Sequence, residues 1–171
     1  VELAAVRLPV VASDNALALA EAAEIGVLDG RVELRSVRAT RLMDAARGVT
    51  VSVELDGIDL ARLATETGLP PLTGQLSGSI PEIEISGGEL RSRGEIVADV
   101  FDGRIRARNL RGSGLGTAVP AFGLDVDFDG ISLGELTGAL DFGYVSGVAR
   151  GAVSGLEFVS WGPVAFDAWL E

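Results

Sequence analysis

Three acidic residues alternate along Asp125-Val-Asp-Phe-Asp-Gly130, a stretch that begins like a calcium-binding loop. In such a loop, alternate carboxylates and a glycine at the sixth position surround the ion, and a bidentate acid follows at the twelfth position. The twelfth position here is Leu136, and Glu135 lies one residue short of it. Val126 and Phe128 are what a half-buried strand requires on its apolar face. We therefore interpret the acids as the solvated face of a strand, and we predict no metal.

Two further patterns have the residue types of a site without its spacing. The run Gly112-Ser-Gly-Leu-Gly116 lacks the spacing of a dinucleotide-binding loop, and it leads to Pro120 instead of a helix. Glu82 and Glu84 carry the paired carboxylates of a glycoside hydrolase, but they lie two residues apart on an ordinary alternating strand. The chain has no His and no Cys, so the usual catalytic triads cannot be assembled. We predict a protein that is not an enzyme and binds no cofactor.

Arg104, Arg106 and Arg108 alternate along one predicted strand of an otherwise acidic protein. Side chains on one face of a strand lie about 6.5–7 Å apart, so these three form a local basic stripe. One interpretation is cross-strand pairing with acids on neighbouring strands, namely Glu82, Glu84 or Glu95. The functional alternative is contact with an acidic partner or with a lipid phosphate.

Composition excludes several classes of function. Fourteen basic residues against 25 acidic ones give a net charge of −11, which argues against nucleic acid and against electrostatic binding to anionic headgroups. Apolar residues make up 47% of the chain and aromatic residues only 5%, so the apolar content is aliphatic. There is no apolar run long enough for a transmembrane helix. Because the chain begins in mid-pattern with Val1-Glu-Leu, we expect a single-domain fragment, residues 1–171, of a longer protein.

Strand signals dominate the chain. Gly48–Asp56 alternates Val and Leu with Thr, Ser, Glu and Asp, and Gly57 is expected to end this strand. Asp102-Gly103 is a hairpin dipeptide between two strands in Arg91–Leu110. Short strands with hairpin turns predict a largely antiparallel sheet with one apolar and one charged face. Such a sheet must close into a barrel, pack on a second sheet, or curl into a trough.

Three short segments have helix signals. Leu60–Thr67 follows Asp59 as a candidate N-cap and precedes Gly68 as a C-terminal stop. A shorter helical turn is predicted at Leu133–Leu136. The run Ala16–Ile25 is rich in Ala, Leu and Glu, and its helix propensity predicts a third helix.

The chain also contains an internal repeat with an offset of 73 residues, over about residues 48–90 and 123–170. The offset keeps glycines in register as well as apolar positions, which chance alternation would not do. The first copy contains Val53, Asp56, Gly57, Ile58, Leu60 and Leu63, and the second contains Val126, Asp129, Gly130, Ile131, Leu133 and Leu136. We conclude that each copy contributes a strand, a short helix and further strands.

The second copy resembles the C-terminal repeats of AsmA-like proteins, a group that includes the TamB and YdbH types. The resemblance rests on Val126-Asp-Phe-Asp-Gly-Ile-Ser-Leu-Gly-Glu-Leu136, Gly147-Val-Ala-Arg-Gly-Ala-Val-Ser-Gly-Leu156 and Gly162-Pro-Val-Ala-Phe-Asp-Ala168. The first copy fits through Leu55-Asp-Gly-Ile-Asp-Leu60 and Leu76-Ser-Gly-Ser-Ile80. The resemblance covers roughly residues 48–171 and implies a curled, mainly β antiparallel sheet, a U-shaped groove with one or two short helices.

The same resemblance implies a non-enzymatic periplasmic protein of the cell envelope, whose parent is anchored in the inner membrane. Its apolar groove would bind or conduct phospholipid acyl chains between the inner and outer membranes. Period-two alternation supplies the candidate lining: Val49, Val51, Val53, Leu55, Ile83, Ile85, Ile96, Ala98, Val100, Ile105, Ala107, Leu124, Val126, Phe128, Val164, Phe166 and Ala168. Two alternatives stay open: a scaffold for outer-membrane protein assembly, and a closed structural β-sandwich.

Overall fold

The structure is a computed structural model that describes residues 9–13, 15–41, 43, 47–67, 71–115, 117, 119–141, 143–159 and 162–171. Strands and two short helices follow one another along this part of the chain. In order they are β1 (Val10–Ser13), β2 (Ala16–Leu19), β3 (Ala23–Val27), β4 (Gly30–Thr40), β5 (Gly48–Asp59), α1 (Leu60–Thr67), β6 (Gly74–Ser86), β7 (Glu89–Val100), β8 (Gly103–Ser113), β9 (Ala121–Ser132), α2 (Leu133–Ala139), β10 (Val148–Val159) and β11 (Gly162–Leu170).

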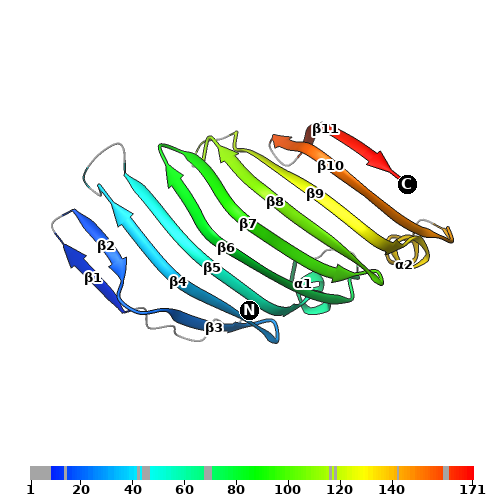
Figure 1. Cartoon of the computed structure of the whole chain (residues 1–171), viewed down its shortest axis with the longest axis horizontal. Coiled ribbons are helices and arrows are strands. Elements are labelled where there is room, and N and C mark those ends of the chain that lie inside the picture. Colours follow the sequence, from blue (N-terminus) through cyan, green and yellow to red (C-terminus); the bar gives the residue numbers. More distant parts are fainter. Residues whose placement is uncertain are drawn as a thin grey trace.

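All eleven strands belong to one sheet (Figure 1). From β4 to β11 each strand pairs antiparallel with the next strand of the sequence, while β2 and β3 both pair with β4 and β1 pairs with β2. Within the described residues the sheet does not close on itself, because β1 and β11 each pair on one side only. The prediction of a mainly β, antiparallel sheet with one or two short helices is confirmed.

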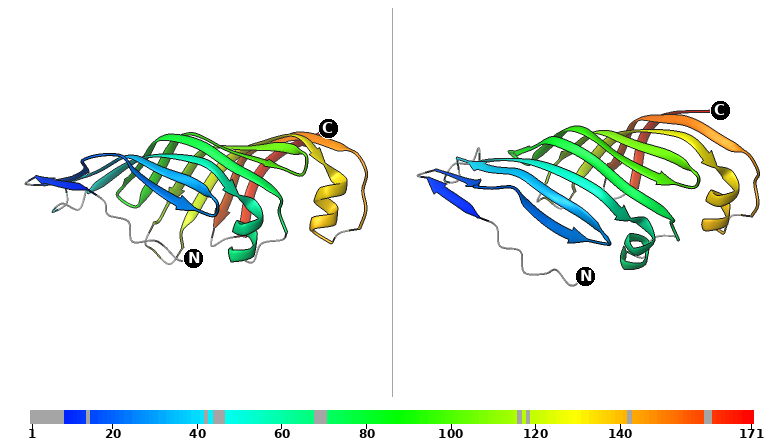
Figure 2. Two further views of the ribbon diagram at one scale, coloured as in Figure 1. Left: turned by 90° about the horizontal axis from the view of Figure 1, so that it is seen from below. Right: turned by 60° about the horizontal axis from the view of Figure 1, so that its bottom comes forward.

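The sheet is curved, and both helices lie on the inner side of the curve (Figure 2). We call the inner side the concave face and the outer side the convex face. Helices α1 and α2 lie at the same end of the strands, next to the hairpin that joins β7 to β8 (Figures 1 and 2). Among the described residues no second sheet packs on the concave face. The architecture is therefore an open trough and not a sandwich.

A row of register shifts crosses the sheet at the middle of its strands. The shifts fall between Leu34 and Ser36, Val51 and Val53, Ser79 and Glu82, Arg91 and Glu95, Arg108 and Arg111, and Val153 and Leu156. A bulge bends its strand and increases the local twist. Because the bulges lie side by side on neighbouring strands, they bend the whole sheet along one line, which gives the trough its curvature.

The internal repeat appears in the order and bounds of the elements. β5 and β9 begin 73 residues apart, and so do α1 and α2, and β7 and β11. Gly57 and Gly130 occupy equivalent positions near the ends of β5 and β9, with positive φ angles of 62° and 72°. Gly57 was expected to end its strand. Instead β5 continues through a bulge at Gly57 as far as Asp59, because glycine adopts this conformation without strain.

The two helices begin at side-chain caps. The Asp59 carboxylate accepts a hydrogen bond of 2.8 Å from the Arg62 backbone N–H, as expected for an N-cap, and Ser132 caps α2 through the Glu135 N–H. The expected stop at Gly68 lies outside the described residues. No helix in the described ranges is long and apolar enough to cross a membrane.

The largest buried cluster lies where the helices meet the concave face. Leu60 from α1, Val100 and Phe101 from the β7–β8 hairpin, and Ile131 from β9 form its centre. Leu63, Leu72, Leu76, Ala98, Ile105, Phe128, Leu136 and Ala139 pack around it. The helices therefore cover only one end of the apolar face, at one rim of the trough.

The predicted helix over Ala16–Ile25 is wrong. The segment forms β2 and β3, which pair with β4 through Leu17 opposite Ala39 and Ile25 opposite Val32. A ten-residue helix is marginal on propensity alone. Pairing with the edge of β4 satisfies the backbone of these residues, and it places Ala23 among the buried residues of the protein.

Candidate functional site

The concave face carries rows of apolar side chains that continue from strand to strand. Cross-strand register places one row on nine strands: Ile25, Val32, Leu55, Gly78, Ile96, Ala107, Val126, Val153 and Ala168. A second row, nearer the other rim, consists of Ala39, Val49, Ile85, Leu90, Gly112, Phe122 and Phe158. No ionisable side chain belongs to either row. The result is a continuous apolar strip along the trough.

The register places the predicted lining residues on this concave face. Val49, Val51, Val53 and Leu55 of β5 lie opposite partners on β6 that include Ile83 and Ile85. Those from β7, β8 and β9 are Ile96, Ala98, Val100, Ile105, Ala107, Leu124, Val126 and Phe128. Phe166 and Ala168 extend the face along β11, at the edge of the sheet. A register shift between Pro163 and Ala165 interrupts the alternation at Val164, so the register does not place that predicted residue on the face.

Accessibility divides these residues into two groups. Val100 is buried in the cluster beneath the helices, and Ala98, Ile105 and Phe128 pack against that cluster. These four residues stabilise one rim of the trough. The remaining lining residues on β5–β9 are only half-buried, which leaves the middle of the trough and its opposite rim accessible.

Several lining residues were missed by the sequence analysis. They are Leu76, Ile80, Leu90, Val153, Leu156 and Phe158. At each bulge, odd- and even-numbered residues exchange faces. A prediction from strict alternation therefore assigns the wrong face to the residues beyond the bulge. On β6, for example, Leu76 and Ile80 share the face of Ile83 only because a bulge separates them. The glycine at the facing bulge, Gly94, is the signal that would have located this change.

A hollow of about 60 Å³ lies over the line of bulges. Its lining includes Ile80, Ile96, Ala107 and Leu124, together with Gly94. At Gly94 the β6 backbone approaches β7 too closely for a side chain, and register shifts on both sides of β7 accompany the hollow. It deepens the trough at the centre of the sheet and offers aliphatic contacts.

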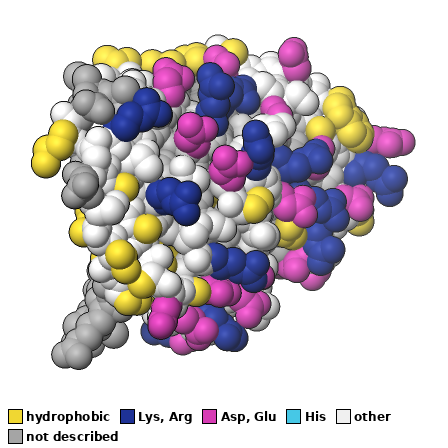
Figure 3. All heavy atoms as spheres, turned by 60° about the vertical axis from the view of Figure 1, so that its left-hand side comes forward, with side chains coloured by type: hydrophobic (Ala, Val, Ile, Leu, Met, Phe, Trp, Pro, Cys, Tyr) yellow, Lys and Arg dark blue, Asp and Glu magenta, His cyan; other side chains and the backbone are white. Residues whose placement is uncertain are grey.

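The convex face is charged, and ion pairs connect many of its side chains. Arginine and acidic side chains intermingle over the surface that Figure 3 presents. The stripe on β8 lies between two acidic strands: Arg104 bonds Asp99 of β7, and Arg108 bonds Asp127 of β9. Arg106 lies between Val97 and Asp127 in the register.

The expected cross-strand pairing of the stripe therefore occurs, mostly with other acids. Glu82 pairs instead with Arg93 at 3.1 Å, and Glu84 lies opposite Arg91. Glu95 is the one expected partner that the register places opposite the stripe, facing Arg108. Exposed ion pairs contribute at most about 1 kcal/mol each. Their main consequence is that the basic stripe already has carboxylates beside it.

Asp99 shows the electrostatic effect of this arrangement. The Arg104 Nε donates a hydrogen bond of 2.6 Å to the Asp99 carboxylate. This hydrogen bond, with the positive charges of Arg104 and Arg106, lowers the pKa of Asp99. The carboxylate therefore stays ionised and bound to the stripe under all but acidic conditions.

Asp125 connects the bulges on the two strands that flank β9. One of its carboxylate oxygens accepts a bond of 2.8 Å from the Gly155 N–H, and the other accepts one of 2.7 Å from the Asn109 Nδ2. Asn109 and Gly155 both have positive φ angles, of 54° and 61°, at the bulges of β8 and β10. The carboxylate suggested as a calcium ligand is thus a structural link. In the described ranges no group of three or more metal-binding side chains occurs.

Replacing Asp125 with Asn is expected to remove part of the stability, in a pH-dependent way. The hydrogen bond from Asn109 and the one from the Gly155 backbone lower the pKa of Asp125. A lowered pKa contributes stability that is present above the ordinary carboxyl pKa and is lost as the pH falls through the folded-state value. We expect Asp125→Asn to cost about 1 kcal/mol at pH 7, and less below pH ~4.

Urea denaturation at pH 7, 5 and 3 measures this difference. Asp141→Asn, in the loop after α2, serves as the matched control and should match the native protein throughout. A difference between Asp125→Asn and the native protein that stays constant over this pH range would contradict the assignment.

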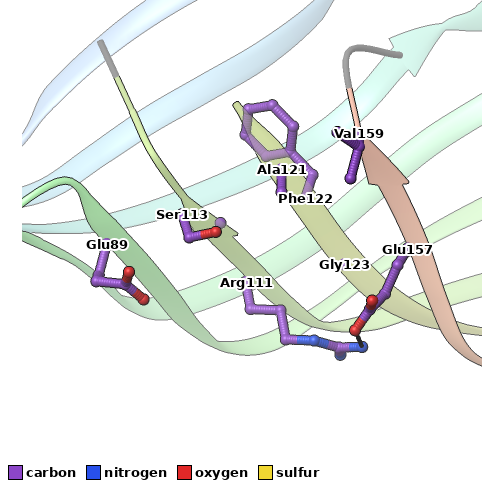
Figure 4. Close-up of a pocket in the computed structure, with 9 residues that line it drawn as sticks. Glu89, Arg111, Ser113, Ala121, Phe122, Gly123, Glu157 and Val159 are labelled. Atoms are coloured by element: carbon purple, nitrogen blue, oxygen red, sulfur yellow. Dashed lines mark ion pairs between the residues drawn. The ribbon is translucent and has the colours of Figure 1, made fainter. Parts of the chain in front are cut away.

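A shallow hollow of about 210 Å³ lies near the second rim, at the far ends of β8, β9 and β10 (Figure 4). The Arg111 side chain reaches across Gly123 to Glu157, and the guanidinium and carboxylate lie 3.7 Å apart. A Cβ on Gly123 would lie 2.6 Å from the Arg111 Nε, so a larger residue there would force the guanidinium to move from this position. Glu89 and Ser113 complete the polar lining. The hollow contains an ion pair that spans β9, between Arg111 of β8 and Glu157 of β10. Its lining does not pair a nucleophile with a base.

The fold and the site together define an open β-trough with a charged outer face and an apolar inner face. No protein-family model matches the chain, and neither the curated proteins nor the solved structures show a significant similarity to it. Functional inference therefore depends on the physical chemistry of the trough.

Proposed function

We propose that the trough binds phospholipid acyl chains, as a non-enzymatic module of a periplasmic protein that carries lipid between the two membranes. The observation that carries the proposal is the aliphatic row from Ile25 to Ala168, which no described segment covers along its middle. Soluble proteins rarely leave a contiguous apolar surface of this kind exposed without a ligand or partner.

Hydrocarbon is the ligand that fits the lining. The rows offer no ionisable group, so the trough supports a ligand that makes no directional bonds along its length. Neighbouring strands lie about 4.8 Å apart, so the row from β5 to β10 extends roughly 24 Å, enough for a long acyl chain.

The energetics are sufficient for binding. Burial is worth about 0.8 kcal/mol per CH₂ group, so a fully covered 16-carbon chain gains on the order of 10 kcal/mol before ordering costs. An open trough covers the chain on one side only and retains a fraction of that value. Such partial coverage suits a ligand that must enter, slide and leave, with the headgroup kept in water at the open side.

A charge in the middle of the strip tests the proposal. Val126 lies between Ala107 and Val153 on the concave face, whereas Val97 lies on the convex face between Ser77 and Arg106. Both side chains are half-buried, so Val126→Glu and Val97→Glu make the same chemical change on opposite faces. We expect Val126→Glu to weaken phospholipid binding at least about tenfold, because a carboxylate must be desolvated under the acyl chain. Val97→Glu should bind normally.

The measurement is native mass spectrometry of the purified chain with a diacyl phospholipid, with circular dichroism as the check of folding. A phospholipid with a photoreactive acyl chain provides a second readout on the native protein and should label β5 and β9 near Val53 and Val126. If the native protein neither retains lipid nor is labelled on the concave face, the proposal fails, whatever the folding of the variants.

A further inference from the structure

Ser92 has the one polar side chain on the concave face of β5 to β9, strands whose residues the structure describes throughout. In the register Ser92 lies opposite Ile83 of β6, two residues before the bulge at Gly94. Ile83 belongs to the apolar face, so the Ser92 side chain lies on the same side of the sheet. The other positions that the register assigns to this face of these strands carry an aliphatic side chain, a phenylalanine or a glycine.

Ser92 also lines the hollow of about 60 Å³ at the line of bulges. The other residues that line the hollow from the concave face are aliphatic or glycine. Glu95 and Arg108 border it too, but they lie opposite each other in the register, on the charged face. Ser92 is half-buried, and its hydroxyl makes no hydrogen bond with the described part of the chain. The hollow therefore combines aliphatic walls with one available hydroxyl, which can donate one hydrogen bond and accept two.

The fold does not require a hydroxyl at this position. The repeat offset of 73 residues places Leu17 and Leu19 of β2 at the positions equivalent to Leu90 and Ser92 of β7. β2 pairs antiparallel with β4 as the beginning of β7 pairs with the end of β8. A leucine therefore occupies the equivalent place beside β4. The hydroxyl is a property of the hollow and not a requirement of the strand.

The hydroxyl affects which acyl chain the trough can cover without loss. A plain hydrocarbon chain over Ser92 removes water from the hydroxyl and leaves it without a partner, which is unfavourable. Such a chain also crosses the hollow without filling it, so the side chains that line it lack contacts there. A chain with a hydroxyl substituent removes both losses. A group of that size needs roughly 10–15 Å³ of such space, and it can form a hydrogen bond with Ser92.

We propose that the hollow binds a hydroxyl substituent near the middle of an acyl chain, and that Ser92 makes the trough selective for such hydroxylated lipids. This inference rests on the proposed binding of acyl chains. The place of the substituent follows from the sheet, because the hollow extends from Ile80 of β6 to Leu124 of β9, at the middle of the row from β5 to β10. A chain of roughly 16–18 carbons laid along that row has its middle carbons over the hollow.

Three single-chain phospholipids test the selectivity by native mass spectrometry of the full native chain. They are lysophosphatidylcholines with a stearoyl, a 10-hydroxystearoyl or a 2-hydroxystearoyl chain. We expect the 10-hydroxystearoyl lipid to bind at least about fivefold more tightly than the stearoyl lipid, which is the effect of one hydrogen bond. The 2-hydroxystearoyl lipid should bind no more tightly than the stearoyl lipid, because its hydroxyl lies next to the headgroup, in water.

Two serine variants assign the selectivity to its residue. Ser92→Ala removes the hydroxyl, and Ser52→Ala makes the same change at a half-buried serine on the convex face of β5. Ser92→Ala should abolish the preference for the 10-hydroxystearoyl lipid and keep stearoyl binding, whereas Ser52→Ala should leave the preference unchanged. Circular dichroism verifies the fold of both variants, and the comparison of lipids on the native chain does not depend on either.

The outcomes separate this inference from the proposed function. Equal binding of the stearoyl and 10-hydroxystearoyl lipids to the native chain overturns the inference and leaves acyl-chain binding intact. A preference that survives Ser92→Ala, or one that the 2-hydroxystearoyl lipid shares, also overturns it. If the native chain binds none of the three lipids and no diacyl phospholipid, the proposed function fails and the inference fails with it.

Discussion

Gly94→Ala should be among the most destabilising single substitutions in this protein, with a loss of about 3–5 kcal/mol in the free energy of unfolding. Gly94 lies at the bulge of β7 with a φ angle of 110°, a conformation that residues with a Cβ rarely adopt. An added Cβ would lie 2.2 Å from the Ser79 carbonyl oxygen and 3.0 Å from the Ile80 Cα. Both contacts are with backbone, so relief requires the β6–β7 pairing to separate at the line of curvature.

Two other glycines separate the steric effect from the conformational one. Gly26 has no atom within 4 Å of an added Cβ and no positive φ angle, so Gly26→Ala should be nearly neutral. Gly57 has a φ angle of 62° but open space around it, so Gly57→Ala should cost about 1 kcal/mol. Chemical denaturation of the three variants gives the comparison. Equal losses at Gly94 and Gly57 would show that the close approach of β6 and β7 does not determine stability.

Phe101→Ala is expected to destabilise the protein by about 3–5 kcal/mol, the range observed for buried Phe in other proteins. Phe101 is 9% exposed and packs with Leu60, Val100 and Ile131 beneath the helices. Its φ angle of 53° is unfavourable for a bulky residue. Burial of the ring in the cluster offsets this cost. Without the ring, the cluster beneath α1 and α2 loses one of its four central side chains.

The matched control is Phe158→Ala, which makes the same change on the same face of the sheet. Phe158 is half-buried in the open part of the trough, away from the helices. Its loss should cost about 1 kcal/mol, because the ring is already in partial contact with water. Thermal unfolding followed by circular dichroism compares the two variants. A Phe158→Ala loss as large as that of Phe101→Ala would mean that the trough is closed in solution, which would also remove the basis of the lipid proposal.

Local patterns determined most elements of the fold. The capping residue Asp59 and the good helix formers after it define α1 over the predicted range, Leu60–Thr67. Alternation along Val49–Leu55 identified the face of β5, and the repeat offset predicted a second strand and helix of the same kind. These features can be predicted because each depends on residues that are close in the sequence, within a single helical turn or a single strand.

Other features depended on contacts between distant residues. Ala16–Ile25 has helix propensity, yet it forms strands, because pairing with β4 satisfies more of its backbone than an isolated short helix would. The partners of the arginine stripe could not be chosen from the sequence. Glu84 lies on β6 and Asp99 on β7, and only the strand order of the sheet shows that β7 is the neighbour of the stripe. Both errors concern which segments are neighbours, and propensity carries no information about that.

The sequence by itself determined an antiparallel, repeated sheet with one apolar face and one charged face, and it excluded the common catalytic triads. Only the tertiary structure decided that the apolar face stays open. The decision depends on bulges such as those at Gly94, Asn109 and Gly155, which lie at corresponding heights on β7, β8 and β10. A bulge is a relation between two strands, defined by an extra residue on one of them, so it cannot be located from either strand alone. Curvature, and with it the trough, follows from the alignment of those bulges across the sheet.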